Sequence, residues 1–176
     1  RRLGSLGAVV EDVQGASPFT QYNSCGRVIL LAEAYAIHEE DLKTRPLDFG
    51  QLTMERIMLG AYISAADLVQ AQRLRRELSQ EVNSIFLKQY DVLLAPSSMT
   101  PAPLIDAPQK GFPLAWPMQT MPFNVTGNPA MSIPIGFSES GLPLSMQIVG
   151  GYFDEATVFR VGQAYEAATQ WHLAWP

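Results

Sequence analysis

Cysteine and histidine are scarce in this chain, and their scarcity excludes several classes of site. Cys25 is the only cysteine among the 176 residues, so no disulfide can form within the chain. The two histidines, His38 and His172, are far apart, and neither has a second histidine or cysteine at the spacing of metal ligands. We therefore expect no metal or other cofactor, and a structural or surface role for His38.

Positive charge and long apolar runs are lacking as well. The net charge of −5 gives no electrostatic reason to expect nucleic acid or an anionic membrane as a partner. No apolar run approaches the roughly 18 residues that span a bilayer. The content of hydrophobic residues, 47%, and of charged residues, 16%, is typical of a globular protein. A lone cysteine agrees with a reducing compartment, so we expect a cytoplasmic protein.

What the chain does contain is a set of short apolar runs that alternate with longer amphipathic segments. The runs predict strands at residues 6–13, 92–95, 130–137 and 144–149. Helical spacing of apolar residues predicts helices at 27–42, at 52–88 with a break near Gly60, and at 155–169 after an N-cap at Asp154. This order predicts an α/β fold with the last three strands adjacent in one sheet. Strand 92–95 should be buried on both faces, and Gln147 needs hydrogen-bond partners if it is buried.

The stretch 121–151 reads MPFNVTGNPAMSIPIGFSESGLPLSMQIVGG, which predicts a loop and then two buried strands joined by a hairpin connection. It resembles the C-terminal signature of the amidase signature family, whose enzymes hydrolyse or transfer carboxamide groups with a Ser–Ser–Lys catalytic set. The segments YDVLLAP at 90–96 and ERIMLGAY at 55–62 are similar to that family too. The resemblance implies the C-terminal part of the amidase signature fold, a mixed β-sheet flanked by helices. Residues 1–176 then form a single partial domain.

The catalytic set that the resemblance implies is missing from this chain. No segment of the form GGSSGG occurs, and none of the lysines, Lys43, Lys88 and Lys110, lies in an apolar, glycine-flanked context that would make it a base. Ser97 and Ser98 follow a predicted strand but have no glycine-rich elbow and no base placed by a motif, so we do not interpret them as nucleophiles. The chain offers no catalytic residue. The resemblance implies that the Ser–Ser–Lys set lies upstream, in the N-terminal half of the same enzyme.

Four residues are candidates for binding a substrate. Thr120, Met121 and Phe123 precede the predicted strand 130–137 and are expected to line the pocket. An arginine at the place of Arg56 helps to hold the substrate carboxylate in the glutamine-dependent A subunits of the family. Those subunits also carry an acid that grips the ammonium of glutamine, whereas residues 116–121, WPMQTM, contain none. We therefore expect an amidase for uncharged or aromatic amides.

Two other interpretations stay open at this point. One is the A subunit of a glutamine-dependent tRNA amidotransferase, and the other is a non-catalytic binding module that uses the same fold. A Gly/Ser-rich segment in the coding sequence upstream of Arg1 would favour an enzyme. The expected partners are a small-molecule amide and the N-terminal half of the enzyme, and a homo-oligomer is compatible with each interpretation.

Overall fold

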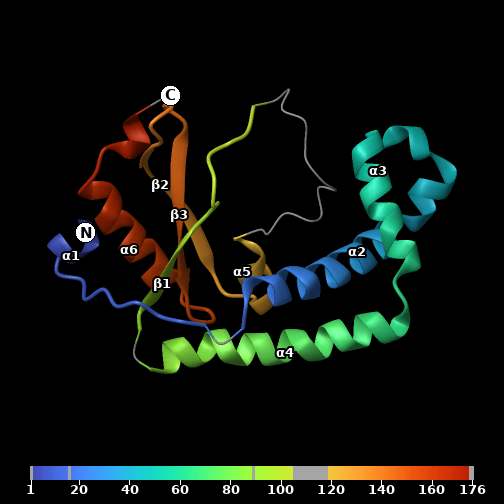
Figure 1. Ribbon diagram of the computed structural model, residues 1–176, viewed down its shortest axis with the longest axis horizontal. Helices are drawn as coiled ribbons and strands as arrows, with labels where there is room; N and C mark the ends of the chain where they lie inside the picture. The colour runs from blue at the N-terminus through green and yellow to red at the C-terminus, as the bar shows by residue number, and fades with distance from the viewer. Residues whose placement is uncertain (1, 16, 89, 105–118, 175–176) are drawn as a thin grey trace.

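The computed structural model describes residues 2–15, 17–88, 90–104 and 119–174, and within them three strands form one sheet. The strands are β1 (Val92–Pro96), β2 (Ala130–Phe137) and β3 (Pro143–Gly150). The α-helices are α1 (Arg2–Ser5), α2 (Phe19–Thr44), α3 (Gln51–Met58), α4 (Ala65–Leu87), α5 (Met121–Thr126) and α6 (Glu155–Ala167), and the 3-10 helices are η1 (Pro46–Asp48), η2 (Leu59–Tyr62) and η4 (Trp171–Leu173). Figure 1 shows the sheet and α6 at one end of the molecule, with α2, α3 and α4 extending away from them.

The sheet has the order β1-β3-β2, and both pairings are antiparallel. Val92 pairs with Gly150 in the β1–β3 ladder. A tight turn joins β2 to β3, and in it the amide of Gly141 donates to the carbonyl of Ser138 over 2.9 Å. The prediction of an α/β fold with these three runs in one sheet is confirmed.

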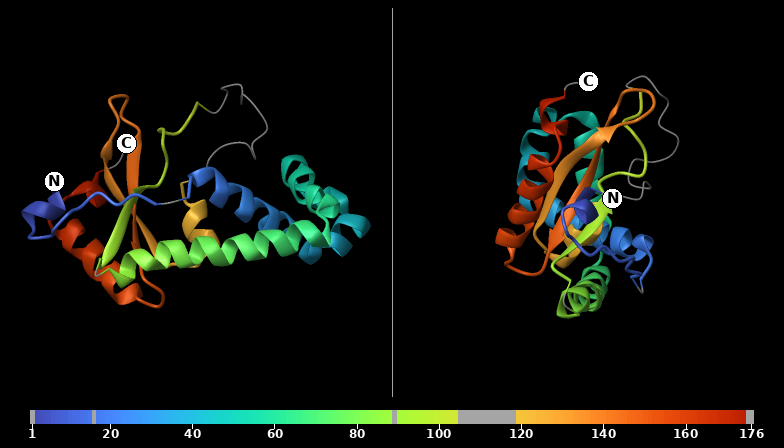
Figure 2. Two further views of the ribbon diagram at one scale, coloured as in Figure 1. Left: turned by 60° about the horizontal axis from the view of Figure 1, so that its bottom comes forward. Right: turned by 90° about the vertical axis from the view of Figure 1, so that its left-hand side faces the viewer.

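One face of the sheet is covered by α6, as Figure 2 shows, and this contact forms an apolar cluster. Its buried members are Ile133, Ile148, Val158 and Tyr165. The predicted N-cap of α6 is confirmed, because a carboxylate oxygen of Asp154 accepts from the amide of Thr157 over 3.3 Å. Phe159 is apolar as well, but it is 64% exposed because it lies outside the row of residues that faces the sheet.

A second apolar cluster lies where α2 packs against α4 and α5. Its buried members are Tyr22, Cys25, Ile29, Ala71, Leu78, Val82, Met121 and Val125. The helical stretch predicted at 52–88 is confirmed together with its break. The break consists of η2 and of Ser64, which caps α4 by accepting from the amide of Asp67.

Three expectations about element positions are wrong. Residues 6–13 form no strand, and Val9 is 88% exposed; a β-branched run needs a neighbouring strand to pair with, and no described strand lies beside this one. Strand β1 is not buried on both faces, since Leu94 is 36% exposed, and it lies at an edge of the sheet, where among the described strands it pairs only with β3. Helix α2 begins at Phe19 rather than at residue 27, because Tyr22 already packs against α4.

Candidate substrate pocket

The segment before β2 contains a short helix, α5, where the sequence predicted a loop. Pro122 stands in its first turn, where a missing N–H costs no helical hydrogen bond. Gly127 ends the helix in the left-handed conformation, at φ 78°, and donates its N–H to the carbonyl of Phe123 over 2.8 Å. Met121 and Phe123 are only 3% and 5% exposed, so the apolar side chains of α5 anchor it to the rest of the fold.

Thr120 and Phe123 line a cavity of about 300 Å³ between α5 and the sheet. The remaining lining residues are Asn124, Asn128, Ala130, Met131, Ser132 and Gln147. No charged side chain of the described chain lines this cavity. Its hydroxyl and amide groups can exchange hydrogen bonds with a neutral carboxamide, and Phe123 offers an apolar wall. This cavity is the candidate substrate pocket.

Gln147 joins three segments at the candidate substrate pocket. It stands opposite Ser132 in the β2–β3 ladder, on the sheet face that turns away from α6, and is 4% exposed. Its side-chain Nε2 donates to the carbonyls of Pro96 and Gln119, each over 3.1 Å. The end of β1 and the segment entering α5 are thereby tied to β3, and the requirement for partners that the sequence indicated is met.

Asn128 plays a similar part at the other end of α5. Its Nδ2 donates to the carbonyl of Gly150 over 2.9 Å and to Oδ1 of Asn83 on α4 over 3.2 Å, and its Oδ1 accepts from Thr126 Oγ1 over 2.7 Å. The helix is thus fastened to both α4 and β3. Sequence reasoning did not single out this residue. The available signal was a polar side chain directly after a glycine that ends a helix.

Met121, the third predicted pocket residue, lines a different cavity. This one has a volume of about 290 Å³ and lies between α2 and α5. Its lining residues are Gly26, Ile29, Leu30, Glu33, Arg75, Met121, Asn124 and Val125. Among the described residues, only Asn124 borders both cavities, so the structure brings Thr120 and Phe123 together and places Met121 on the opposite side of α5.

Arg56 lies on α3 and lines neither cavity. Helix α3 packs against α2 and η2, whereas α5 packs against α2 and α4. The side chain is half-buried, and its Nε is enclosed without a hydrogen-bond partner among the described residues. The structure therefore does not bring Arg56 together with Thr120 and Phe123.

The hydroxyls of Ser97 and Ser98 are engaged locally. Ser97 Oγ lies 3.0 Å from Ser132 Oγ, and Ser98 Oγ donates to the carbonyl of Thr100 over 2.8 Å. Neither hydroxyl is hydrogen-bonded to a lysine or a histidine in the described ranges, so no base is placed there to activate it. That neither serine is a nucleophile stays a prediction.

The two histidines, His38 and His172, each contact a neighbouring side chain. His38 packs edge-on against Phe49 with ring centroids 5.7 Å apart, and His172 Nδ1 lies 3.6 Å from Glu166 Oε1. The part of the chain that the structure describes holds no group of three or more His, Cys, Asp or Glu side chains suited to a metal ion. It also holds no helix that is both long and apolar enough to cross a membrane.

Comparison with known proteins identifies the family. The family model described as Amidase matches residues 2–159. The chain belongs to the Amidase family. The A subunit of the glutamyl-tRNA(Gln) amidotransferase of Lysinibacillus sphaericus (strain C3-41) is 34% identical over 99% of this chain and 40% of that protein. The same protein of Chloroflexus aurantiacus (strain ATCC 29366 / DSM 635 / J-10-fl) is 40% identical over 82% of this chain and 31% of its own length. This member of the Amidase family spans at most about two-fifths of the length of these relatives.

Solved structures of other family members show the same fold. A crystal structure of an amidase has a TM-score of 0.81 and 29% identity, over 94% of this chain and 39% of that one. A bacterial aryl acylamidase of the amidase signature enzymes has a TM-score of 0.72 and 26% identity, over 98% of this chain and 39% of that one. The A subunit of the glutamyl-tRNA(Gln) amidotransferase of Thermotoga maritima has a TM-score of 0.64 and 32% identity, over 96% of this chain and 37% of that one. Nearly the whole length of the chain therefore matches a part of the amidase signature fold.

Proposed function

We propose that this chain forms the C-terminal part of an amidase that cleaves the C–N bond of a neutral carboxamide to a carboxylic acid and ammonia or an amine. Membership of the Amidase family supports the class of reaction. The observation that carries the substrate class is the candidate substrate pocket around Thr120 and Phe123, which has no charged residue in its described lining. A charged substrate group would lose its hydration there without gaining an opposite charge.

In this proposal the chain positions the substrate and does not attack it. Phe123 packs against the apolar part of the amide, while Asn124 and Ser132 exchange hydrogen bonds with the carboxamide. The nucleophilic serine, its relay serine and the basic lysine belong to the N-terminal half of the enzyme, which is the partner of this chain. Loss of nucleophile and base costs a serine hydrolase about a millionfold in turnover, so the chain alone is inactive.

A second candidate function is the A subunit of a glutamine-dependent tRNA amidotransferase. The curated relatives described above favour it, since both carry that name. Glutamine brings an ammonium and a carboxylate, and each needs a partner of opposite charge. The described lining of the candidate substrate pocket offers none, which is why we place the neutral amide first.

For Arg56 and Met121 we propose supporting roles. Arg56 contributes only to substrates with an acidic group, so in the complete enzyme Arg56→Ala raises KM for acidic amides and spares neutral ones. Met121 supports the substrate from the opposite side of α5 by holding that helix against α2. Equal effects of Arg56→Ala on acidic and neutral amides would remove it from the site.

We also propose that the protein works in the cytoplasm. Cys25 is a free, buried thiol whose Sγ donates to the carbonyl of Ala71 over 3.2 Å. Free cysteines persist in reducing compartments. Fractionation of cells that express the complete gene, followed by detection of the protein, tests this location.

The decisive experiment assays the purified chain against benzamide, an aliphatic amide and glutamine, alone and after co-expression with the N-terminal half of its enzyme. We expect turnover only for the combination, with neutral amides preferred. Phe123→Leu should raise KM for benzamide about tenfold, because a pocket contact is lost, and Gln163→Ala on the exposed side of α6 is the matched control.

Three other results of this experiment would each support a different function. Turnover by the chain alone that disappears in Ser97→Ala or Ser98→Ala would overturn the assignment of catalysis to the other half. A preference of the combination for glutamine would support the amidotransferase. A combination that binds amides but turns over none of them would leave a non-catalytic binding module.

A further inference from the structure

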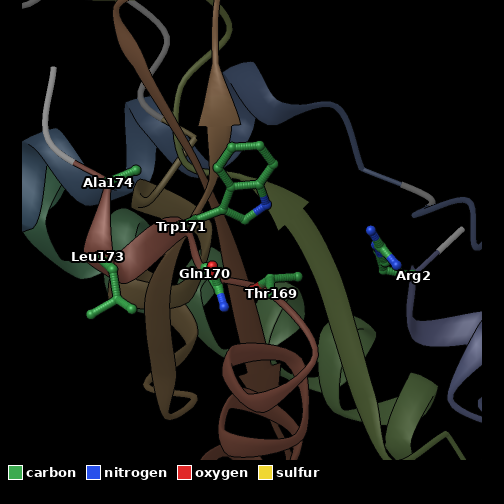
Figure 3. A pocket seen from close by; sticks show the side chains of 6 residues that line it. All are labelled: Arg2, Thr169, Gln170, Trp171, Leu173 and Ala174. Atoms are coloured by element: carbon green, nitrogen blue, oxygen red, sulfur yellow. The ribbon is translucent and has the colours of Figure 1, made fainter.

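A cavity of about 350 Å³ lies between α1 and the C-terminal segment, away from the candidate substrate pocket. Figure 3 shows its lining residues, which are Arg2, Thr169, Gln170, Trp171, Leu173 and Ala174. It shares no lining residue with the candidate substrate pocket. The guanidinium of Arg2 is the only charged group that the described chain contributes to it.

Both sides of this cavity are anchored to the sheet. On one side, Leu3, the neighbour of Arg2, packs against the apolar cluster between α6 and the sheet. On the other side, the Trp171 ring is edge-on to Phe137 with centroids 6.2 Å apart, and it lies 3.7 Å from the position of a Cβ built on Gly136. The β2–β3 hairpin therefore fixes the indole, and α1 is fixed by its own apolar contact.

The polar groups of the cavity are mostly hydrogen-bond donors. In Figure 3 the N–H edge of Trp171 is turned to the side on which the guanidinium of Arg2 lies. Arg2 forms no ion pair with any other residue of the described ranges. The amide of Gln170 adds further donors. Glu166 does not line this cavity; it lines an adjoining one that shares Thr169, and its carboxylate lies 3.6 Å from Nδ1 of His172. Donors that share a space without an acid among them favour an anion.

We propose that this cavity binds a small carboxylate with a flat apolar body, for which benzoate is the simplest probe. The guanidinium of Arg2 pairs with the carboxylate, and the indole N–H of Trp171 donates to it. The indole ring of Trp171 covers the apolar body. Inorganic phosphate would satisfy the donors but would leave the apolar wall unused, and benzamide has the ring without the charge.

The test follows the indole N–H signal of Trp171 in a ¹⁵N-labelled full chain, with the signal assigned through Trp171→Phe. Benzoate should shift this signal saturably, and phosphate and benzamide should bind at least about tenfold more weakly. Arg2→Gln keeps much of the length but loses the charge, so benzoate should bind about 10 to 100 times more weakly. Arg73→Gln, on an exposed part of α4, is the matched control and should bind benzoate like the parent chain.

Several results of this titration would overturn the proposal. No shift at Trp171 with about 10 mM benzoate, equal binding of phosphate, or unchanged binding in Arg2→Gln would each overturn the proposal. Loss of the dispersed amide signals of the sheet would show that Arg2→Gln is misfolded, and Trp171→Phe then takes its place. This variant keeps an aromatic ring but removes the indole N–H donor. Benzoate binding, followed on the backbone amide of Gln170, should then be several-fold weaker than in the parent chain. Benzamide shifts near Phe123 report on the candidate substrate pocket separately, so failure of either proposal is seen without the other.

Discussion

Two buried amide side chains, those of Gln147 and Asn128, fix the backbone around the candidate substrate pocket. Each uses its NH₂ group to bond two acceptors, and these lie on segments far away in the sequence. A buried carbonyl without a donor costs about 1 to 3 kcal/mol, so such residues hold a loop in place more firmly than apolar contacts alone. The shape of the pocket wall therefore depends on single side chains.

Replacing Gln147 with leucine should lower the free energy of unfolding by about 2 to 4 kcal/mol, because the carbonyls of Pro96 and Gln119 lose their donor. Urea unfolding should show a lower midpoint with an unchanged slope. Gln163→Leu, at an exposed position of α6, should stay within about 0.5 kcal/mol of the parent chain. A loss of equal size in both variants would contradict this role.

At the scale of elements, α2 is the helix on which the other helices are assembled. It contacts η2 and α3 along one part, and α4 and α5 along another. Ser17, just before α2, donates its backbone N–H to the carboxylate of Glu81 on α4 over 2.8 Å. The side chain of Tyr22 is hydrogen-bonded to the same carboxylate. Because α5 packs on α2, the position of the candidate substrate pocket depends on this helix pair.

Gly60→Ala should separate η2 from α2. A Cβ at Gly60 would collide with the carbonyl of Leu31 and with the Cβ of Tyr35, and backbone atoms cannot turn aside as a flexible side chain can. We expect a loss of about 3 kcal/mol in the free energy of unfolding, measured in urea. Gly50→Ala is the control, since nothing lies within 4 Å of its new Cβ, and its stability should be unchanged or slightly higher.

The α2–α4 contact should weaken in alkali. Burial, together with the nearby carboxylate of Glu81, raises the pKa of Tyr22 to about 12 from the ordinary 10.0. Between these pH values the unfolded tyrosine ionises while the folded one stays neutral, so the contribution of Tyr22 to stability is full below pH 10 and is lost as the pH rises to about 12. The loss should reach about 2 to 3 kcal/mol.

Urea unfolding at a series of pH values measures this effect. Tyr22→Phe should flatten the alkaline decline, whereas Tyr62→Phe should keep it, because Tyr62 is 83% exposed. The thiol of Cys25 adds a decline of the same sign, since burial raises its pKa against an opposing effect of Arg75. An identical slope in the parent chain and in Tyr22→Phe would rule out the tyrosine as the cause.

At the scale of the molecule, the chain contains a sheet with an open edge among its described strands. It spans 40% of the length of its Lysinibacillus relative, and among the described strands β1 pairs only with β3. Large apolar side chains are exposed on several elements, among them Leu94 on β1 and Leu47 on η1. An unpaired edge with apolar residues is a site for pairing with another chain.

The isolated chain should therefore self-associate or bind a hydrophobic dye. Light scattering over a concentration series should show species larger than a monomer. Leu94→Lys places a charge on the open edge and should reduce association, while Leu47→Lys, at a residue that is 97% exposed away from the sheet, should not. A monodisperse monomer with little dye binding at high concentration would refute this.

The sequence by itself determined the elements whose signals are local. Three apolar runs became the strands of one sheet, Asp154 capped α6, and the helical stretch broke next to Gly60. Each depends on residues within a few positions of one another, where periodicity, capping and turn chemistry act. The motif at 121–151 also indicated the protein family, because a sequence motif depends only on the order of the residues.

Only the tertiary structure decided which residues meet. Met121 and Phe123 are two positions apart, yet they line different cavities because α5 turns between them. Leu94 is exposed at an edge strand, and Arg56 lies on a helix that packs away from α5. Gln147 finds its acceptors at Pro96 and Gln119, dozens of positions earlier. Contacts between segments so distant depend on how whole elements pack, and no local pattern of residues encodes that packing.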